Sequence, residues 1–237
     1  MIKSVPIGLS AALLAASIAI AAEQADLERL AETNSCIDCD LSRVELVGLD
    51  LTGADITGAY LVTTNLTGAT LVGANLTEAY VRSATLVGAD LTDAILINTY
   101  FETAILSGAT LIRADLTDAG LRGATLRDVN LTDAIMTNAN LTNANLTNAN
   151  LTDADLINAN LTGASLTGAV LTAAILRDAT LDRAGLRGAD LTGADLTNAH
   201  LSNANLTDAI VAAATLTGAI FCRTTMPNGE INNTGCP

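Results

Sequence analysis

Ala139-Asn140-Leu141-Thr142-Asn143 is a five-residue unit that recurs with small changes along most of this chain, and residues 189–193 repeat it as Ala-Asp-Leu-Thr-Gly. From position 41 to position 221 every fifth residue is apolar without a break, which gives (221 − 41)/5 + 1 = 37 positions, of which 31 are Leu. A second column lies two residues before each of these positions, and 31 of its 36 members are Ala. The period of five therefore governs the chain from residue 41 to residue 221.

A period of five fits neither of the regular secondary structures. In an α-helix five residues advance roughly 140° past a full turn, so the leucines would visit every side of the helix. In a long strand an odd period sends successive leucines to opposite faces. A backbone that bends after every five residues turns Leu and Ala inward and leaves the other three residues in water. Alanine suits the second column because a narrow core has no room for two large side chains per unit.

The unit resembles the motif of the pentapeptide repeat family, Ala-(Asp/Asn)-Leu-X-X, over about residues 36–225. The resemblance implies an all-β solenoid, a right-handed quadrilateral β-helix with four units per coil. At four units per coil the 37 units make about nine coils. With strands spaced at ~4.8 Å, such a rod is roughly 43 Å long.

The N-terminus has the layout of a secretory signal peptide. Lys3 provides a positive n-region, an apolar stretch runs from Ile7 to about Ile20, and Ala19-Ile20-Ala21 fits a small-x-small cleavage site. We therefore assign residues 1–21 to a signal peptide, the alternative being an uncleaved anchor helix, for which the apolar run is short. Cleavage predicts an exported protein, in a periplasm or a thylakoid lumen, with no membrane attachment afterwards.

Both ends of the repeat region carry sequences expected to cap it. Residues 22–40 form the N-terminal cap, where Glu23 to Thr33 predicts a short helix with Leu27, Leu30 and Ala31 on one face. Residues 41–221 form the β-helix, and residues 222–237 form the C-terminal cap. The segment from Phe221 to Cys236 resembles the C-terminal closure of cyanobacterial lumenal members of the family. The resemblance thus extends to an exported subgroup.

The four cysteines lie in two pairs, one before and one after the repeats. Cys36 and Cys39 precede the first unit, and Cys222 and Cys236 follow the last. A rod of roughly 43 Å keeps the two pairs apart, because a disulfide needs Cα atoms within ~7 Å. The expected bridges are Cys36–Cys39 and Cys222–Cys236, and the same distance excludes a single four-cysteine metal site. A redox role for the Cys-X-X-Cys pair is the alternative.

Residues 20 apart stack on neighbouring coils if four units make a coil. Tyr60, Tyr80 and Tyr100 are all the tyrosines of the chain, and they fall in one outward column. This column predicts either an interaction strip for a partner or sugar ring, or an aromatic ladder that stabilises the coils. Two charge ladders are expected on the same spacing. They consist of Arg82, Glu102 and Arg122, and of Asp93, Arg113 and Asp133.

The composition excludes several classes of function. The chain has 237 residues with 11 basic and 25 acidic side chains, a net charge of −14. This balance argues against direct binding to a phosphate backbone. The single His has no neighbouring ligand or nucleophile, and a convex rod provides no concave, desolvated pair of carboxyl groups for acid–base chemistry. We therefore expect no catalytic residues, no cofactor and no metal.

The sequence as a whole predicts an exported, non-enzymatic rod that acts as a structural or protein-interaction module. Its protein partner is not identified, and it is expected to be a monomer or a weak end-to-end oligomer. Two alternatives stand beside this hypothesis. One is an acidic DNA mimic that modulates a type II topoisomerase, as some acidic members of the family do. The other is an ice- or carbohydrate-binding surface, suggested by a threonine column at Thr52, Thr92, Thr132, Thr152, Thr172 and Thr192.

Overall fold

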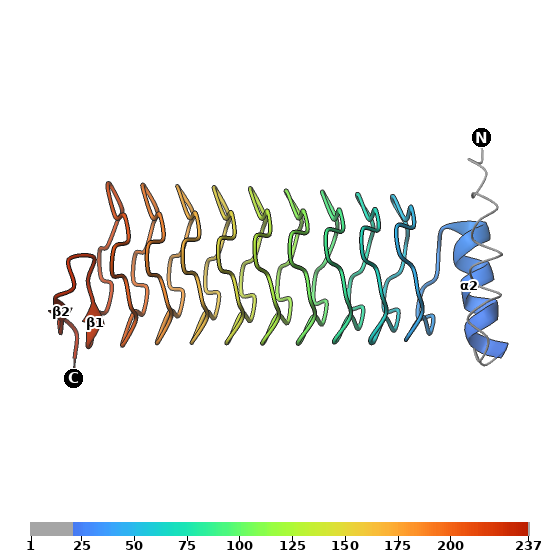
Figure 1. Cartoon of the computed structure of the whole chain (residues 1–237), viewed down its shortest axis with the longest axis horizontal. Helices are drawn as coiled ribbons and strands as arrows, with labels where there is room; N and C mark the ends of the chain where they lie inside the picture. Colours follow the sequence, from blue (N-terminus) through green and yellow to red (C-terminus); the bar gives the residue numbers. More distant parts are fainter. Residues whose placement is uncertain (1–20, 237) are drawn as a thin grey trace.

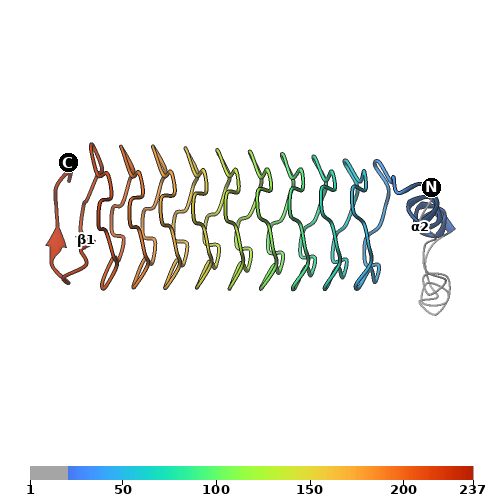
Figure 2. The same cartoon turned by 90° about the horizontal axis from the view of Figure 1, so that it is seen from above.

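The computed structural model describes residues 21–236. Nearly all of the predicted signal peptide, residues 1–20, lies outside the described residues. The described chain forms a rod in which successive coils lie side by side, with a helix at one end and a small hairpin at the other (Figures 1 and 2). Within residues 21–236, no helix has the length and apolar character needed to cross a membrane.

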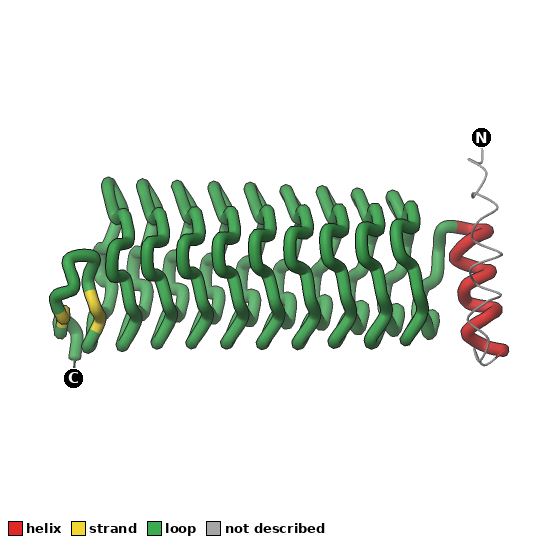
Figure 3. The backbone as a smooth tube through the Cα atoms, in the orientation of Figure 1, coloured by secondary structure: helices red, strands yellow, loops and turns green. Residues whose placement is uncertain are grey.

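Every parallel β-bridge between neighbouring coils joins residues that are 20 apart in the sequence. The parallel β-bridges begin at Ser35 with Asp55 and continue at each fifth residue to Asn205 with Thr225. Since each unit has five residues, four units make one coil, as the resemblance implies. Each side of a coil pairs through a single residue, so the body of the rod is drawn as loop and turn rather than strand (Figure 3).

One unit shows how the backbone groups are paired. The Leu141 N–H donates to the Asn160 carbonyl at 2.7 Å on the next coil, and the Asn160 N–H donates back to Ala139 at 2.9 Å. Within the corner, the Ala144 N–H donates to the Leu141 carbonyl at 2.9 Å. The repeat therefore pairs its main-chain groups along the rod and closes each corner with a tight turn.

Each corner explains a residue preference that the sequence pattern left open. The residue two positions after each inward Leu has a positive φ, for example 57° at Asn143 and 67° at Gly163. Glycine, asparagine and aspartate tolerate this left-handed conformation best. This is why Gly, Asn and Asp dominate the last position of the unit.

The core is the pair of columns predicted from the period of five. The inward Leu side chains between Leu51 and Leu206 are at most 2% exposed, and Ala fills the positions between them. Three inward positions hold a buried Thr, whose hydroxyl donates to a carbonyl of the preceding coil: Thr64 to Leu41 at 2.6 Å, Thr99 to Leu76 at 2.7 Å and Thr224 to Leu201 at 2.6 Å. Among the described residues, no buried side-chain nitrogen or oxygen lacks a hydrogen-bond partner.

Helix α2, Ala21–Thr33, covers the N-terminal end of the rod. It begins two residues before the predicted Glu23 and ends where predicted. Leu27 and Leu30 are 5% and 4% exposed and belong to the core, while Ala31 is half-buried. The helix thus extends the core beyond the first coil.

The C-terminal end is a hairpin made of β1, Thr224–Thr225, and β2, Ile231–Asn232, paired antiparallel. Thr225 of β1 also bridges to Asn205 of the coil below. Between the strands, the Gly229 N–H donates to the Met226 carbonyl at 2.9 Å and closes a turn at Met226-Pro227-Asn228-Gly229.

Candidate functional site

The tyrosine column is the most distinctive feature of the outer surface. Each tyrosine directly precedes an inward core residue, so its side chain points away from the core. The bridges Tyr60–Tyr80 and Tyr80–Tyr100 place the three residues in register on successive coils. Tyr60 is 46% exposed, and the other two are half-buried.

The three rings stack on one another. The ring centroids of Tyr60 and Tyr80 are 4.9 Å apart with planes at 5°, and those of Tyr80 and Tyr100 are 4.9 Å apart with planes at 14°. Stacking covers the faces of the central ring and leaves ring edges toward solvent. A sugar ring binds by lying on an exposed aromatic face, so the central ring, Tyr80, offers no face to a sugar. The Tyr60 ring stacks on Tyr80 through one face, and Tyr60 is 46% exposed.

A charged pair lies beside the stacked rings. The Arg82 guanidinium carbon is 6.0 Å from the Tyr80 ring centroid and 5.3 Å from that of Tyr100. Its Nε also donates to Glu102 at 2.9 Å. A cation this close to aromatic rings is attracted by their π-electrons. The strip therefore combines aromatic, cationic and acidic groups, and we define the tyrosine strip as Tyr60, Tyr80, Tyr100, Arg82 and Glu102.

The stack ends where the column reaches Gly120. A Cβ atom added at Gly120 would lie 2.9 Å from Glu102 Oε1 and 3.9 Å from Tyr100 Cδ1. The Glu102 carboxylate therefore occupies the space beside the last ring, where a side chain at position 120 would lie. Sequence reasoning placed Glu102 in a charge ladder and did not anticipate its role beside the rings.

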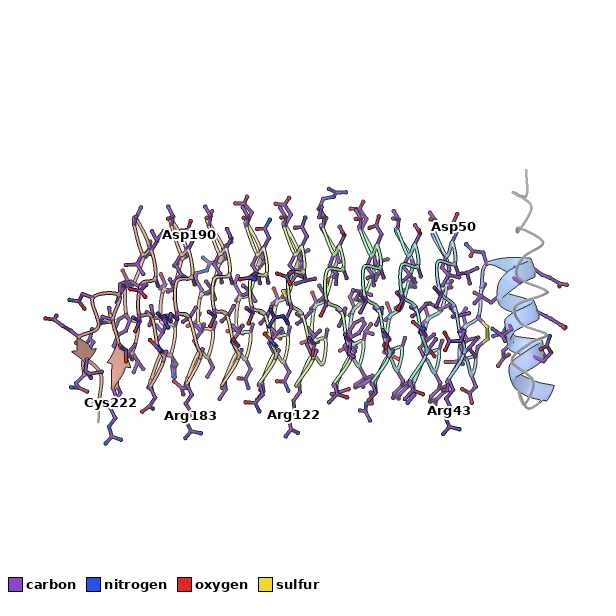
Figure 4. The ribbon with its side chains drawn as sticks, viewed as in Figure 1. Arg43, Asp50, Arg122, Arg183, Asp190 and Cys222 are labelled. Carbon is purple, nitrogen blue, oxygen red and sulfur yellow. A yellow bond between two sulfur atoms is a disulfide. The ribbon has the colours of Figure 1, made fainter. Side chains whose placement is uncertain are left out.

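The expected charge ladders form as pairs. Arg113 donates to both carboxylate oxygens of Asp93 at 2.7 Å, and these hydrogen bonds hold the pKa of Asp93 below its usual value. The same partner raises the pKa of Arg113. No hydrogen bond or ion pair joins Asp133 to Arg113, or Arg122 to Glu102, among the described residues. Figure 4 shows Arg122 projecting outward from the same edge of the rod as Arg43 and Arg183.

The cysteines lie at the two ends in the expected pairs. The Cys36 and Cys39 sulfurs are bonded, with Cα atoms 5.3 Å apart, and so are those of Cys222 and Cys236, with Cα atoms 4.7 Å apart. Both Cys36 and Cys39 are buried, whereas Cys222 is half-buried and Cys236 is exposed.

Two residues of helix α2, Arg29 and Asp26, lie beside the Cys36–Cys39 disulfide. The sequence pattern did not reveal these contacts. The Arg29 guanidinium lies 2.6 Å from Cys39 Sγ and donates to the Ile37 carbonyl at 2.6 Å. A carboxylate oxygen of Asp26 and the sulfurs of Cys36 and Cys39 lie within 4.8 Å of one another. Because the two sulfurs are bonded to each other, neither is a thiolate ligand in this arrangement. The group is thus a structural junction between helix and rod.

The threonine column uses its hydroxyl protons internally. In each of five members the hydroxyl donates to a side-chain oxygen two residues earlier, and the same oxygen accepts the Thr N–H. These members are Thr52, Thr92, Thr132, Thr152 and Thr192. At Asp190 this pair of bonds from Thr192 lowers the pKa of the carboxyl. A hydroxyl whose proton is already donated offers only its lone pairs to ice or a glycan, which weakens that alternative.

Comparisons with known proteins agree on the repeat. The family model for pentapeptide repeats matches eight overlapping segments between residues 35 and 226. The crystal structure of HetL, a pentapeptide repeat protein involved in heterocyst differentiation regulation from the cyanobacterium Nostoc sp., is 34% identical over 82% of this chain and 92% of that chain, with a TM-score of 0.42. The comparison with curated protein sequences found no match.

Two further solved structures are similar to parts of the chain. QnrB1, a plasmid-mediated fluoroquinolone resistance protein, is 23% identical over 74% of this chain and 88% of that chain, with a TM-score of 0.61. That likeness concerns the fold alone. A pentapeptide repeat protein from the Arabidopsis thaliana thylakoid lumen is 31% identical over 42% of this chain and 66% of that chain, with a TM-score of 0.29.

Proposed function

The chain belongs to the pentapeptide repeat family, and from this premise we propose that it is an exported, non-enzymatic rod that binds a protein partner through the tyrosine strip. The observation that carries the proposal is the stack of three rings with Arg82 beside them. Aromatic residues and arginine are the side chains most enriched where proteins bind one another. Elsewhere on the described surface the exposed large apolar side chains are isoleucines and valines, and the tyrosine strip is where aromatic rings lie beside an arginine.

The proposal also covers the export of the protein and the shape of its coils. Residues 1–21 act as a signal peptide, and the mature protein works in a periplasm or thylakoid lumen. The coil is a right-handed quadrilateral, as in the family. Mass spectrometry of the mature protein tests the export step, because cleavage after Ala21 or Ala22 removes the only lysine and makes the net charge more negative, from −14 to 10 − 25 = −15.

Affinity capture from an extract of the exported compartment tests the partner site. The mature protein is compared with a variant in which Tyr60, Tyr80 and Tyr100 are replaced by Ser. A matched control replaces Ile95, Ile135 and Ile175, an outward column on another face, by Ser. We expect a protein that is retained by the mature form and by the control, and lost from the tyrosine variant.

A second variant separates two uses of the rings. Replacing the three tyrosines by Phe preserves the stack and removes the hydroxyl groups. Loss of the partner from the Ser variant alone indicates contact with the ring edges, and loss from both indicates contact with the hydroxyls. Equal capture by all four proteins would contradict the proposal and would leave the column as a ladder that stabilises the coils.

The acidic DNA mimic stays an alternative because of one observation, the net charge of −14 on a rod. Inhibition of DNA supercoiling by a type II topoisomerase in the presence of the purified rod is the test. The two hypotheses make different predictions for the tyrosine-to-Ser variant. If the rod acts as a DNA mimic, the variant inhibits as well as the unmodified protein, because the negative charge is spread over the rod.

A further inference from the structure

The last coil of the rod has main-chain groups that no other segment pairs. One coil earlier, the N–H groups of Leu191, Gly193, Leu196 and Asn198 donate to the last coil at 2.7–2.9 Å. The equivalent N–H groups of the last coil, those of Val211, Ala213, Leu216 and Gly218, make no hydrogen bond within the described residues. Two sides of the last coil are therefore an open sheet edge.

The core is also uncovered at this edge. Val211, Ala214, Leu216 and Ala219 continue the inward columns, yet all four are only partly buried. Ile210 beside them is 51% exposed. From residue 209 to residue 222 no side chain carries a charge. Proteins usually protect an open edge with charged residues or proline, and neither is present here.

The C-terminal hairpin covers only the other two sides. It accepts hydrogen bonds from the N–H groups of Leu206 and Asp208 through Thr225 and Pro227, and from Phe221 through Thr234. Figure 1 shows the hairpin over one half of the last coil, with nothing over the half that lies on the side of Asp190 in Figure 4. The open half is thus an uncovered step at the end of the rod. We call it the C-terminal ledge and define it as residues 209–219.

We propose that the C-terminal ledge binds an extended segment of a partner protein, which pairs with the free main-chain groups and adds part of a further coil. The proposal goes beyond the proposed function, because the ledge lies on the last coil and the tyrosine strip lies on coils nearer the N-terminal end. Strand addition of this type draws its affinity from main-chain hydrogen bonds and its specificity from side chains that fill pockets. The segment must bring an apolar side chain over Val211 and another over Leu216, five residues apart, with a small residue two positions before each.

Charge and shape favour such a segment over a second copy of the chain. Each copy carries a net charge of −14, so two rods repel each other. The hairpin rises beside the ledge and obstructs flat contact between two rod ends, whereas a single extended segment needs only one free layer. The partner segment is therefore neutral or basic and follows the repeat pattern.

The chain itself provides the probe. Residues 159–172 have the required pattern and no charged side chain, with Leu161, Leu166 and Leu171 five residues apart. A fluorescent peptide of this sequence is titrated into the exported protein and followed by anisotropy, beside a scrambled peptide of the same composition. We expect saturable binding of the first peptide alone. Hydrogen exchange at Val211, Ala213, Leu216 and Gly218 is fast in the free protein, and the peptide slows it at least tenfold.

Matched variants locate the binding. Leu216→Glu places a charge in the ledge and is expected to weaken peptide binding at least tenfold. Ile135→Lys changes a side chain that is 42% exposed in the middle of the rod and is expected to leave binding unchanged. A thermal melt of each variant, followed by circular dichroism, shows whether it is folded, and the exchange experiment on the unmodified protein stands even if Leu216→Glu fails to fold.

Three results would overturn the proposal. They are equal binding of the scrambled peptide, slow exchange at the four amides in the free monomer, and a dimer by light scattering whose four amides are already protected. The last result would identify a second copy as the occupant. If the peptide fails to bind while capture still depends on the tyrosines, only the C-terminal ledge is refuted. If the peptide binds the ledge while capture does not depend on the tyrosines, only the tyrosine strip is refuted.

Discussion

The two ends of the rod meet the same physical problem and differ in how they solve it. A solenoid ends in exposed core and unpaired main-chain groups unless something covers them. At the N-terminal end, α2 packs Leu27 and Leu30 against the first coil. Side chains there also bond main-chain groups: the Asp26 carboxylate accepts the Asp40 N–H at 2.9 Å, and Asn34 Nδ2 donates to the Thr52 carbonyl at 3.0 Å.

At the C-terminal end the hairpin covers half of the last coil. Among the described residues, no side chain accepts a hydrogen bond from the four free N–H groups, which are those of Val211, Ala213, Leu216 and Gly218. The inward columns continue to both ends, with Val44 and Leu49 in the Ala column near the N-terminal end and Val211 in the Leu column near the C-terminal end. Val44 and Leu49 are also only partly buried, so the ends differ in their covering segment more than in their repeats. The difference teaches that stability and binding divide between the ends: one is built into the core, and the other keeps an edge that a partner can use.

The largest expected effect compares equivalent leucines near the two ends. Leu46 is 4% exposed, while Leu216 is only partly buried. Leu46→Ala is expected to lower the free energy of unfolding by about 3 kcal/mol, the usual cost of a buried Leu-to-Ala change, and Leu216→Ala by about 1 kcal/mol. Urea denaturation of the purified variants measures both. Equal losses would mean that Leu216 is as well covered as Leu46 and that the two ends do not differ.

The second comparison concerns the two disulfides. Dithiothreitol is expected to reduce Cys222–Cys236 first, because Cys236 is exposed and Cys36 is fully buried. Alkylation at increasing reductant concentration, followed by peptide mass spectrometry, gives the order. The bridge between Cys222 and Cys236 spans 14 residues, so the double Ser variant is expected to lose about 3 kcal/mol of stability by loop-closure entropy. Prior labelling of Cys36 and Cys39 would show instead that the helix end opens more readily.

How far the sequence predicted these features depends on the range of the interaction. The period of five predicted which side chains are buried, because every Leu from Leu51 to Leu206 repeats the same local geometry. The stacking of Tyr60, Tyr80 and Tyr100 followed once residues 20 apart were known to be neighbours. The placement of Arg82 over those rings did not follow, because an arginine has several rotamers and the sequence gives only its column.

The ends were predicted less completely than the body. The apolar column runs without a break to Phe221, so the period alone did not distinguish the buried Leu206 from the partly buried Leu216. Coverage depends on where the hairpin folds back, which is a tertiary property. In the same way, the contacts of Asp26 and Arg29 with the N-terminal bridge depend on how α2 lies against the rod. The orientation of the helix is set by tertiary packing, which the repeat pattern does not predict.

A third prediction tests whether the ends differ in backbone strain as well. Ala213 on the last coil and Arg43 near the first both occupy corners with positive φ, 56° and 64°. Replacing either by Gly is expected to raise stability by up to about 1 kcal/mol, because the left-handed conformation costs a residue with a Cβ atom roughly 1–2 kcal/mol. Thermal melts measure the change. Gly218→Ala, whose added Cβ would collide with the Asn198 side chain, is the control of opposite sign.

Similar gains at Ala213 and Arg43 would show that corner strain is common to the whole rod and that only coverage distinguishes the ends. A gain confined to Ala213 would instead assign the weakness of the C-terminal end to its own backbone. The two outcomes separate a local cause from the absence of a covering segment.

The smallest expected effect concerns acid stability directly below the ledge. Asp190 and Asp195 bridge to Ile210 and Thr215 of the last coil. Hydrogen bonds from Thr192 and Thr197 lower the pKa of these two carboxyl groups. A carboxyl whose pKa is lower folded than unfolded stabilises the fold above the unfolded pKa of about 3.9, and this contribution is lost as the pH falls toward the folded pKa. Acidification below about pH 4 is therefore expected to destabilise the C-terminal end of the rod.

Exchanging Asp and Asn tests this expectation, because the chain already uses Asn with the same bonds. The Asn140 side-chain oxygen accepts a hydrogen bond from the Thr142 N–H at 3.1 Å and from the Thr142 hydroxyl at 2.7 Å. Asp190→Asn with Asp195→Asn preserves the acceptors and removes the titration, so the unfolding free energy should vary less with pH between pH 5 and 3. Asn140→Asp should add pH dependence in the middle of the rod. If the double Asn variant loses stability with acid as steeply as the unmodified protein, the acid sensitivity lies in other carboxyl groups. The contrast between the two ends would then rest on coverage alone.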